Sequence, residues 1–375
     1  MVATCGVGLE PLLAAELDAL DLGPTESDKG AVRFAGSWAD CWRANWRLRT
    51  ANRVLVELGS WDGSDGDALA QGAQTLIEGD RRAGPDVGAL LHPDRTFSIR
   101  ATTRESRISD LRWAALRVKD GLVDGQRRRW RARSSIERDR PDVSLRLRLF
   151  RDRATLTLDT SGEPLDRRGY RVETTTAPVR ENLAAACVLA AEWSGGGPVI
   201  DPMCGSGTLL AEAGAVVLGL APGRLRRHWA FARLPSFDRR RWDGIRQEPL
   251  PRLADDVTLI GVDQDRHAVS AACTNLEAAG LADHARIRRG DAFETTPPPV
   301  AGLLLVNPPY GERLSDSREA WKRLGDLMKQ QYSGYRAVVL AGDPGRGKFI
   351  GLRPSRKIPV MNGPIAARIL VFDLY

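Results

Sequence analysis

Apolar and polar positions follow two different patterns along the chain, and the second half shows the simpler one. Short apolar runs, typical of buried strands, alternate there with longer segments of helical periodicity. Strands are predicted at residues 198–200, 259–263, 286–289, 303–306 and 336–341, helices at 208–218, 266–279 and 317–332, and a final pair of strands at 356–375. This order predicts an α/β domain with a Rossmann-like, doubly wound, seven-stranded sheet.

The first half of the chain contains shorter strands that alternate strictly between polar and apolar residues. Residues 144–149 and 155–158 alternate in this way. They predict a hairpin whose leucines, Leu145, Leu147 and Leu149, face inward, with Arg146 and Arg148 facing outward. Residues 108–123 have helical periodicity, with Leu111, Ala115 and Val118 on one stripe. The first half is therefore expected to be an α+β region.

Length and composition limit the class of protein. A chain of 375 residues is long for one hydrophobic core, so two or three domains are expected. No apolar stretch approaches the length of a membrane span, and Met1 to Leu13 lacks the basic and apolar segments of a signal peptide. A cytoplasmic protein is expected. Five scattered cysteines and four histidines predict neither disulfides nor a metal site.

A glycine-rich turn follows the first predicted strand of the second half. It contains Asp201, Pro202, Met203, Cys204, Gly205, Ser206, Gly207 and Thr208. Glycines let the backbone approach a ligand, and the following helix offers free N–H groups. We expect this turn to bind a nucleotide-like cofactor, with Cys204 as a small packing residue rather than a nucleophile.

Two further strand ends carry acidic residues suited to the same ligand. Asp263 ends the second strand and could accept from a ribose diol, and Asp291, followed by Ala292, could accept from an adenine amino group. In a dinucleotide site the acid lies about 20 residues after the glycines, but Asp263 lies 56 residues after Gly207. An insertion therefore separates the first two strands.

The motif Asn307-Pro308-Pro309-Tyr310 ends the strand at 303–306. The Asn307 side-chain oxygen and the Pro308 carbonyl could accept both N–H bonds of a planar amino group, while Tyr310 stacks on its ring. Pro309 and Pro308 restrict the turn. Most of the catalysis would then be positioning. The motif predicts methyl transfer to such a nitrogen, and by itself it does not choose among guanine, adenine and glutamine amides.

Positive charge is concentrated between Arg95 and Arg171. This segment holds 21 Arg and Lys against 11 Asp and Glu, whereas the net charge of the whole chain is only +7. The residues expected to contact RNA phosphates are Arg127, Arg128, Arg129, Arg131, Arg133, Arg146 and Arg148.

The inserted segment, residues 221–256, is both basic and aromatic. Between Arg224 and Arg252 it has nine arginines and three acids, with Trp229, Phe231 and Trp242 among them. Such a composition suits RNA, where bases stack and phosphates pair. The alternative, favoured for the aromatic residues, is that they pack as a core of the insert.

Together the motifs resemble those of class I S-adenosyl-L-methionine-dependent methyltransferases. Residues 201–208 and 307–314 are most similar to those of THUMP-domain RNA guanine-N2 methyltransferases, especially the bacterial enzymes that modify 23S rRNA. The similarity includes Thr4 to Leu17, the THUMP-like segments 112–125 and 141–143, the connector segments 158–165 and 168–171, and residues 177–185. One departure, Ala211 in place of a larger aliphatic residue, concerns packing.

This resemblance implies an N-terminal ferredoxin-like segment (1–50), a THUMP RNA-binding domain (51–160), a connector (161–177) and a methyltransferase domain (178–375). It implies that Asn182 assists cofactor binding, that the substrate is 23S rRNA, and that the THUMP domain grips RNA. The alternatives are a tRNA guanine-N2 methyltransferase and, more weakly, an adenine or protein-glutamine methyltransferase or a non-catalytic RNA-binding assembly factor. Some relatives are fused to a second methyltransferase, which we do not expect in a chain ending at Tyr375.

Overall fold

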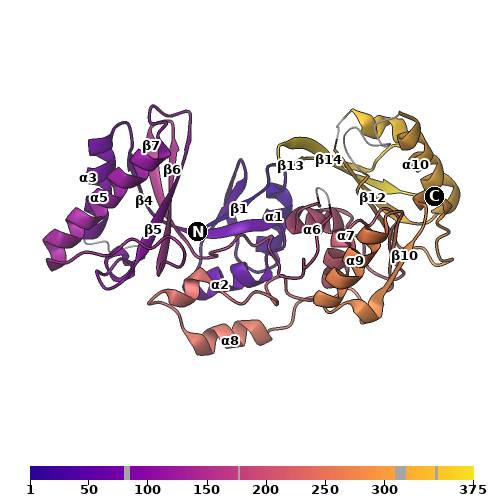
Figure 1. Ribbon diagram of the computed structural model, residues 1–375, viewed down its shortest axis with the longest axis horizontal. Coiled ribbons are helices and arrows are strands. Elements are labelled where there is room, and N and C mark those ends of the chain that lie inside the picture. The colour runs from indigo at the N-terminus through magenta and orange to yellow at the C-terminus, as the bar shows by residue number, and fades with distance from the viewer. Residues whose placement is uncertain (80–84, 176–177, 309–317, 343–344) are drawn as a thin grey trace.

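The computed structural model describes residues 1–79, 85–175, 178–308, 318–342 and 345–375. The elongated molecule contains two seven-stranded sheets, and the end of the first sheet that includes β1, together with α1, lies on the side of the second sheet (Figure 1).

The first sheet has the strand order β2-β3-β1-β4-β7-β6-β5. Its strands are β1 (Val2–Cys5), β2 (Pro24–Asp28), β3 (Ala31–Phe34), β4 (Ala51–Asp62), β5 (Phe97–Arg104), β6 (Val143–Phe150) and β7 (Arg153–Asp159). The associated helices are α1 (Glu10–Asp18), α2 (Trp38–Arg47), α3 (Gly66–Glu78), α4 (Val87–Leu90) and α5 (Leu111–Trp130). The long strand β4 pairs with β1 through its first residues and with β7 through its later ones. One continuous sheet therefore serves both predicted N-terminal domains.

The predicted hairpin is confirmed. Strands β6 and β7 pair antiparallel, and Leu145, Leu147 and Leu149 are buried. Arg146 and Arg148 alternate with them on the opposite face, where their side chains are 26% and 52% exposed. The period-two pattern therefore placed this strand correctly.

The predicted apolar stripe of α5 is right for Val118, which is buried, and wrong for Leu111 and Ala115. Leu111 is exposed and Ala115 only half-buried, whereas Ala114, Val118 and Leu122 are buried. The physical reason is the close approach of α3 at Gly121 and Gly125, which turns the buried face of α5 away from Leu111. A Cβ added at Gly121 would lie 2.0 Å from the Ala70 carbonyl oxygen of α3.

The second sheet has the strand order β10-β9-β8-β11-β12-β14-β13, and its first five strands are parallel. They are β8 (Val199–Asp201), β9 (Leu259–Asp263), β10 (Ala285–Arg289), β11 (Leu303–Val306) and β12 (Arg336–Ala341), followed by the antiparallel β13 (Arg356–Asn362) and β14 (Ile365–Asp373). The helices of this domain are α6 (Glu181–Ala190), α7 (Thr208–Val217), α9 (Arg266–Ala278) and α10 (Arg318–Gln331). The predicted doubly wound architecture is confirmed.

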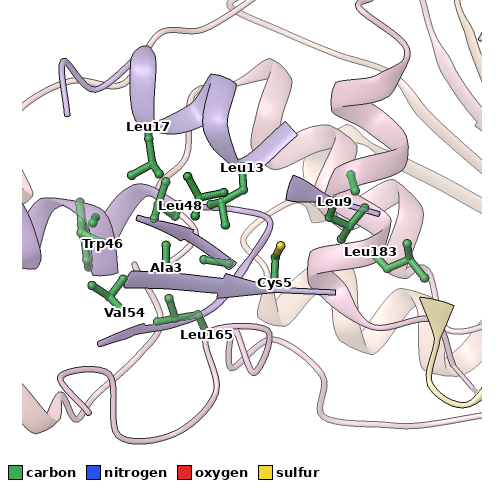
Figure 2. Close-up of a cluster of buried hydrophobic side chains, with 14 of the residues drawn as sticks. Ala3, Cys5, Leu9, Leu13, Leu17, Trp46, Leu48, Val54, Leu165 and Leu183 are labelled. Atoms are coloured by element: carbon green, nitrogen blue, oxygen red, sulfur yellow. The ribbon is translucent and has the colours of Figure 1, made fainter. Parts of the chain in front are cut away.

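The hydrophobic core of the N-terminal region continues into the second domain. Leu9 and Leu13 of the α1 segment belong to the same buried cluster as Ala3 of β1 and Leu183 of α6 (Figure 2). Arg49 reinforces this contact by donating to the carbonyls of Ala215 and Leu220. The two sheets are therefore joined by packing as well as by the connector.

The insert between β8 and β9 folds against α2. It contains α8 (Arg239–Gln247), below α2 in Figure 1, and the short helix η1 (Ala230–Arg233). Phe231 stacks on Trp229, and both lie in a cluster with Trp42 and Trp46 of α2 and Trp242 of α8. The prediction that these aromatic residues pack as a core is confirmed.

Candidate active site

Four strand ends bring the predicted site residues to one edge of the second sheet. Because β10, β9, β8 and β11 are parallel neighbours, their carboxyl ends meet at the same edge, where open α/β sheets bind ligands. Asp201 ends β8, Asp263 ends β9, and Asp291 and Asn307 follow β10 and β11 closely.

The glycine turn requires glycine at two positions for different reasons. Gly205 and Gly207 have φ of 50° and 79°, in the left-handed region that disfavours side chains. A Cβ at Gly207 would lie 3.2 Å from the Ala272 Cβ of α9, whereas a Cβ at Gly205 would meet only the Thr175 Oγ1, at 3.9 Å. Gly207 thus permits close helix packing, and Gly205 leaves open space at the turn.

Asp201 is the most unusual group in this region. Burial, with a smaller contribution from the nearby Asp263 carboxylate, raises the pKa of its carboxyl to about 8. One oxygen accepts from the Met203 N–H at 3.1 Å, while Oδ2 is buried and has no hydrogen-bond partner among the described residues. A buried, unpaired carboxylate oxygen is costly, and a cationic ligand group at the turn would satisfy it.

Asp263 connects the two turns on either side of it. Its Oδ2 accepts from the Gly205 N–H and its Oδ1 from the Asp265 N–H, each at 2.9 Å. Asp291 caps a short helix, accepting from the Phe293 N–H at 2.9 Å. Both carboxylates therefore have fixed orientations, and each oxygen retains a second lone pair for a ligand. The other predicted contact residues at these turns, Pro202, Cys204, Ser206, Thr208 and Ala292, are buried.

Asn307 and Pro308 lie directly beyond β11, on the strand adjacent to Asp201. The pairing of Leu304 with Ile200 brings the end of β11 beside the end of β8. Asn307 is half-buried and Pro308 is buried. Pro309 and Tyr310 of the same motif lie outside the described residues.

Asn182 lies on α6 and contacts the N-terminal region. Its side-chain nitrogen donates to Asn52 Oδ1 at 2.8 Å and to the Thr50 carbonyl at 3.3 Å. The structure does not bring it together with the glycine turn through these contacts. Its role in cofactor binding stays a prediction.

The sequence analysis missed Asn275, a buried residue on α9 that connects the glycine turn to the connector. Its side-chain nitrogen donates to the carbonyls of Ser206 and Glu173, and its oxygen accepts from the N–H groups of Val172 and Glu173. An asparagine on a stripe otherwise made of Ala268, Ala272 and Leu276 was the signal that could have identified it.

A cavity of about 360 Å³ lies beside this connection. It is lined by Glu173, Thr174 and Thr175 of the connector and by Asp265, His267, Ser270 and Ala271 at the start of α9. Thr175 is also the residue that a Cβ added at Gly205 would meet. The connector therefore forms one wall of the candidate site.

Buried polar residues hold the rest of the connector on α7. Glu212 of α7 accepts from the Tyr170 hydroxyl at 2.9 Å and from Arg168 Nε at 3.3 Å. Burial, together with the Glu212 charge, raises the pKa of Tyr170, which stays a neutral donor. Arg171 donates to the Thr208 hydroxyl at 3.2 Å. These contacts fix the connector relative to the glycine turn.

The arginines predicted to contact RNA are divided between two surfaces. At the end of α5, Arg127 pairs with Asp124, Arg128 with Glu78, and Arg129 donates to the Ile77 carbonyl. Arg131 and Arg133 are exposed nearby. Arg146 and Arg148 lie on the face of β6 away from the buried leucines. The contribution of both groups to RNA binding stays a prediction.

Within the residues that the structure describes, no helix is long and apolar enough to cross a membrane. Among the same residues, no group of three or more His, Cys, Asp or Glu side chains is arranged to hold a metal ion.

Comparison with known families agrees with this architecture. The family described as "RMKL-like, methyltransferase domain" matches residues 168–370. An RlmL ferredoxin-like domain matches residues 1–55, and a THUMP domain matches residues 67–159.

Individual proteins are similar over nearly the whole chain. The ribosomal RNA large subunit methyltransferase K/L of Syntrophotalea carbinolica is 40% identical over 99% of this chain, which spans only 53% of that relative. A candidate RNA methyltransferase of Synechocystis sp. is 32% identical over 100% of this chain and 96% of its own length. The solved structure of SMU.472, a candidate methyltransferase complexed with SAH, superposes with a TM-score of 0.88 at 26% identity, covering 100% of this chain and 97% of that one. The chain belongs to the RMKL-like methyltransferase family, with a ferredoxin-like and a THUMP domain ahead of its methyltransferase domain.

Proposed function

We propose that the protein transfers a methyl group from S-adenosyl-L-methionine to the exocyclic N2 of a guanine in 23S rRNA. The observation that carries this proposal is the neighbouring placement of Asp201 and Asn307 at the ends of β8 and β11. One residue can hold a cationic cofactor group, and the other can orient an amino group beside it.

The residues at the glycine turn fit the cofactor. The unpaired Oδ2 of Asp201 suits the ammonium of its methionine portion, and Asp263 and Asp291 suit its ribose and adenine. Gly205 leaves room for its approach. When bound, the cofactor supplies an electrophilic methyl group. The SMU.472 structure, which contains SAH, supports this assignment.

Asn307 and Pro308 would position the acceptor. Their oxygens accept the two N–H bonds of the guanine amine, which favours the positive charge that develops on nitrogen as the N–C bond forms. The methylated amine then releases its extra proton to solvent, so this step requires no strong general base. The guanine must leave its stack to reach the strand ends, at a cost of a few kcal/mol.

The choice of 23S rRNA rests on the relatives. The Syntrophotalea protein is named as a large-subunit rRNA methyltransferase, and the THUMP match overlaps the basic segment from Arg95 to Arg171. A protein-glutamine methyltransferase would not need such a segment.

The test uses purified protein, radiolabelled S-adenosyl-L-methionine, and separate rRNA and tRNA pools from a strain that lacks the gene. N2-methylguanosine in the 23S pool is the expected product. The same nucleoside in the tRNA pool would support guanine-N2 methylation but would make tRNA the substrate. Labelled adenosine would overturn the proposed role of Asn307 and Pro308, and no labelled nucleoside in either pool would contradict RNA methylation.

A further inference from the structure

One face of the first sheet is polar and basic. Helices α3 and α5 lie on the other face (Figure 1), against which Leu145 and Leu147 are buried. The register pairs Arg100 of β5 with Arg146 of β6, and Thr102 with Arg148. Side chains at paired positions share one face, so this face carries adjacent arginines.

A groove of about 1200 Å³ extends from this face to the insert. Its walls are formed by strands β5 and β6, the segment 138–141, the connector from 162 to 169, and the insert from 225 to 246. The lining includes twelve arginines but only three acidic residues. The groove therefore has a strong excess of positive charge.

Some of these arginines are structural. Arg226 is stacked over Trp229 and donates to the carbonyls of Ser161, Glu163, Pro164 and Arg167, which fastens the insert to the connector. The aromatic rings of the insert pack against Trp42 and Trp46 of α2, and Trp229 and Trp242 are buried. The groove is thus strongly charged, and the tryptophans that line it are buried, so they offer no exposed platform for bases.

Other lining arginines have uncompensated charge. Arg100, Arg138, Arg140 and Arg227 are exposed, and none of their side chains forms an ion pair within the described parts of the chain. They come from β5, the segment 138–141 and the insert, and so lie on different walls of one groove. Unpaired guanidinium groups on several walls are suited to consecutive phosphates along a strand.

We propose that this groove binds the RNA substrate by its phosphate backbone, independently of sequence, with Arg100, Arg138, Arg140 and Arg227 as its phosphate contacts. This inference rests on the proposed RNA methyltransferase function. The proposal places RNA binding on the sheet face and the insert. At the end of α5, by contrast, Arg127, Arg128 and Arg129 already interact with neighbouring groups.

The connector relates the groove to the active site. Glu163 lines the groove, and Glu173 lines the cavity beside the glycine turn. The chain between them, 163–173, can span at most roughly 33–36 Å. That length corresponds to about ten stacked nucleotides at 3.4 Å each. An RNA strand of this length is sufficient to connect the phosphates bound in the groove to the guanine in the active site.

The experiment compares two variants that each remove two positive charges. Arg138→Gln/Arg227→Gln alters the groove, and Arg131→Gln/Arg133→Gln alters the end of α5. Binding of a fluorescent 23S rRNA fragment is measured by anisotropy over a range of salt concentrations. The groove variant is expected to bind about tenfold more weakly, with a salt slope reduced by about two, because two phosphate contacts are lost. The α5 variant is expected to bind like the wild type.

The proposal is overturned if both variants lose affinity equally, if only the α5 variant loses it, or if neither does. Polyglutamate serves as a competitor of the same charge sign. If it bound the groove as tightly as the RNA fragment does, the assignment of the groove to RNA would likewise be overturned. SAH affinity, measured by calorimetry, should be unchanged in both variants and shows that they are folded. A wild type that binds RNA through the groove but methylates none would contradict the proposed function and leave the groove assignment intact.

Discussion

At the scale of single residues, Asp201 combines a cost to stability with a proposed role in cofactor binding. Burial holds its folded pKa near 8, above the ordinary value of 3.8. Between these values the native state retains a proton that the unfolded state loses, so the Asp201 contribution to stability is present at low pH and is lost as pH rises through about 8.

Asp201→Asn should therefore stabilise the cofactor-free protein at alkaline pH. The variant is expected to melt at least about 2 °C above the wild type at pH 8.5, with the difference disappearing near pH 4. Thermal melts across this pH range measure it. A difference that is independent of pH would contradict the assigned ionisation.

The same substitution should weaken cofactor binding. Losing a charge-assisted hydrogen bond costs about 1.5–3 kcal/mol, so we expect SAH to bind Asp201→Asn roughly 10- to 100-fold more weakly. Calorimetric titration at pH 8.5 gives the comparison. Wild-type affinity in the variant would exclude Asp201 from the binding site.

Asn307 should affect the chemical step and leave cofactor binding unchanged. Because its side-chain oxygen is proposed to act on charge that develops during transfer, Asn307→Ala is expected to lower kcat about 10²- to 10³-fold. The Kd for SAH should stay within about twofold. Single-turnover methylation and calorimetry separate the two effects, and equal losses in both would count against the assigned role.

At the scale of elements, the packing of α3 on α5 depends on glycine. Gly121→Ala would place a Cβ 2.0 Å from the Ala70 carbonyl oxygen, so the helices must separate, and we expect a loss of about 1–3 kcal/mol in the free energy of unfolding. Gly244→Ala is the matched control, because a Cβ at this exposed position of α8 meets nothing within 4 Å. It should stabilise by up to about 1 kcal/mol. Chemical denaturation tests both, and similar effects of the two substitutions would refute the packing explanation.

The insert shows why sequence composition alone left two interpretations open. Arginine beside tryptophan is typical both of RNA-binding segments and of a packed insert. The aromatic residues of the insert contact Trp42 and Trp46 of α2, and this contact shows that they are packing residues. That contact joins segments almost 200 residues apart, and no local pattern predicts it.

At the scale of the whole molecule, Arg226 connects the insert to the connector. Arg226→Lys retains the charge but loses the fork that reaches several carbonyls. We expect weaker RNA binding, a lower melting temperature and unchanged SAH affinity, because the groove wall moves while the glycine turn does not. Fluorescence anisotropy with RNA and thermal melts provide the measurements. A lysine variant with the RNA affinity and melting temperature of the wild type would show that only the charge at position 226 matters.

The sequence by itself determined the strands and helices of the methyltransferase domain and the order of its site residues. Periodicity, glycine turns and strand ends are local properties, so Asp201, Asp263 and Asn307 could be placed at the carboxyl ends of strands before the fold was known. The period-two pattern of β6 was equally informative, because successive side chains of a strand point to opposite faces of the sheet.

Only the tertiary structure decided what these elements contact. It showed that Asn275 holds the connector on the glycine turn, that Gly121 and Gly125 lie against α3 while Leu111 is exposed, and that Arg129 is engaged while Arg100 and Arg227 are exposed in one groove. The physical reason is that packing and ion pairing depend on partners distant in the chain. A residue type specifies which interactions are possible, and the fold selects which of them form.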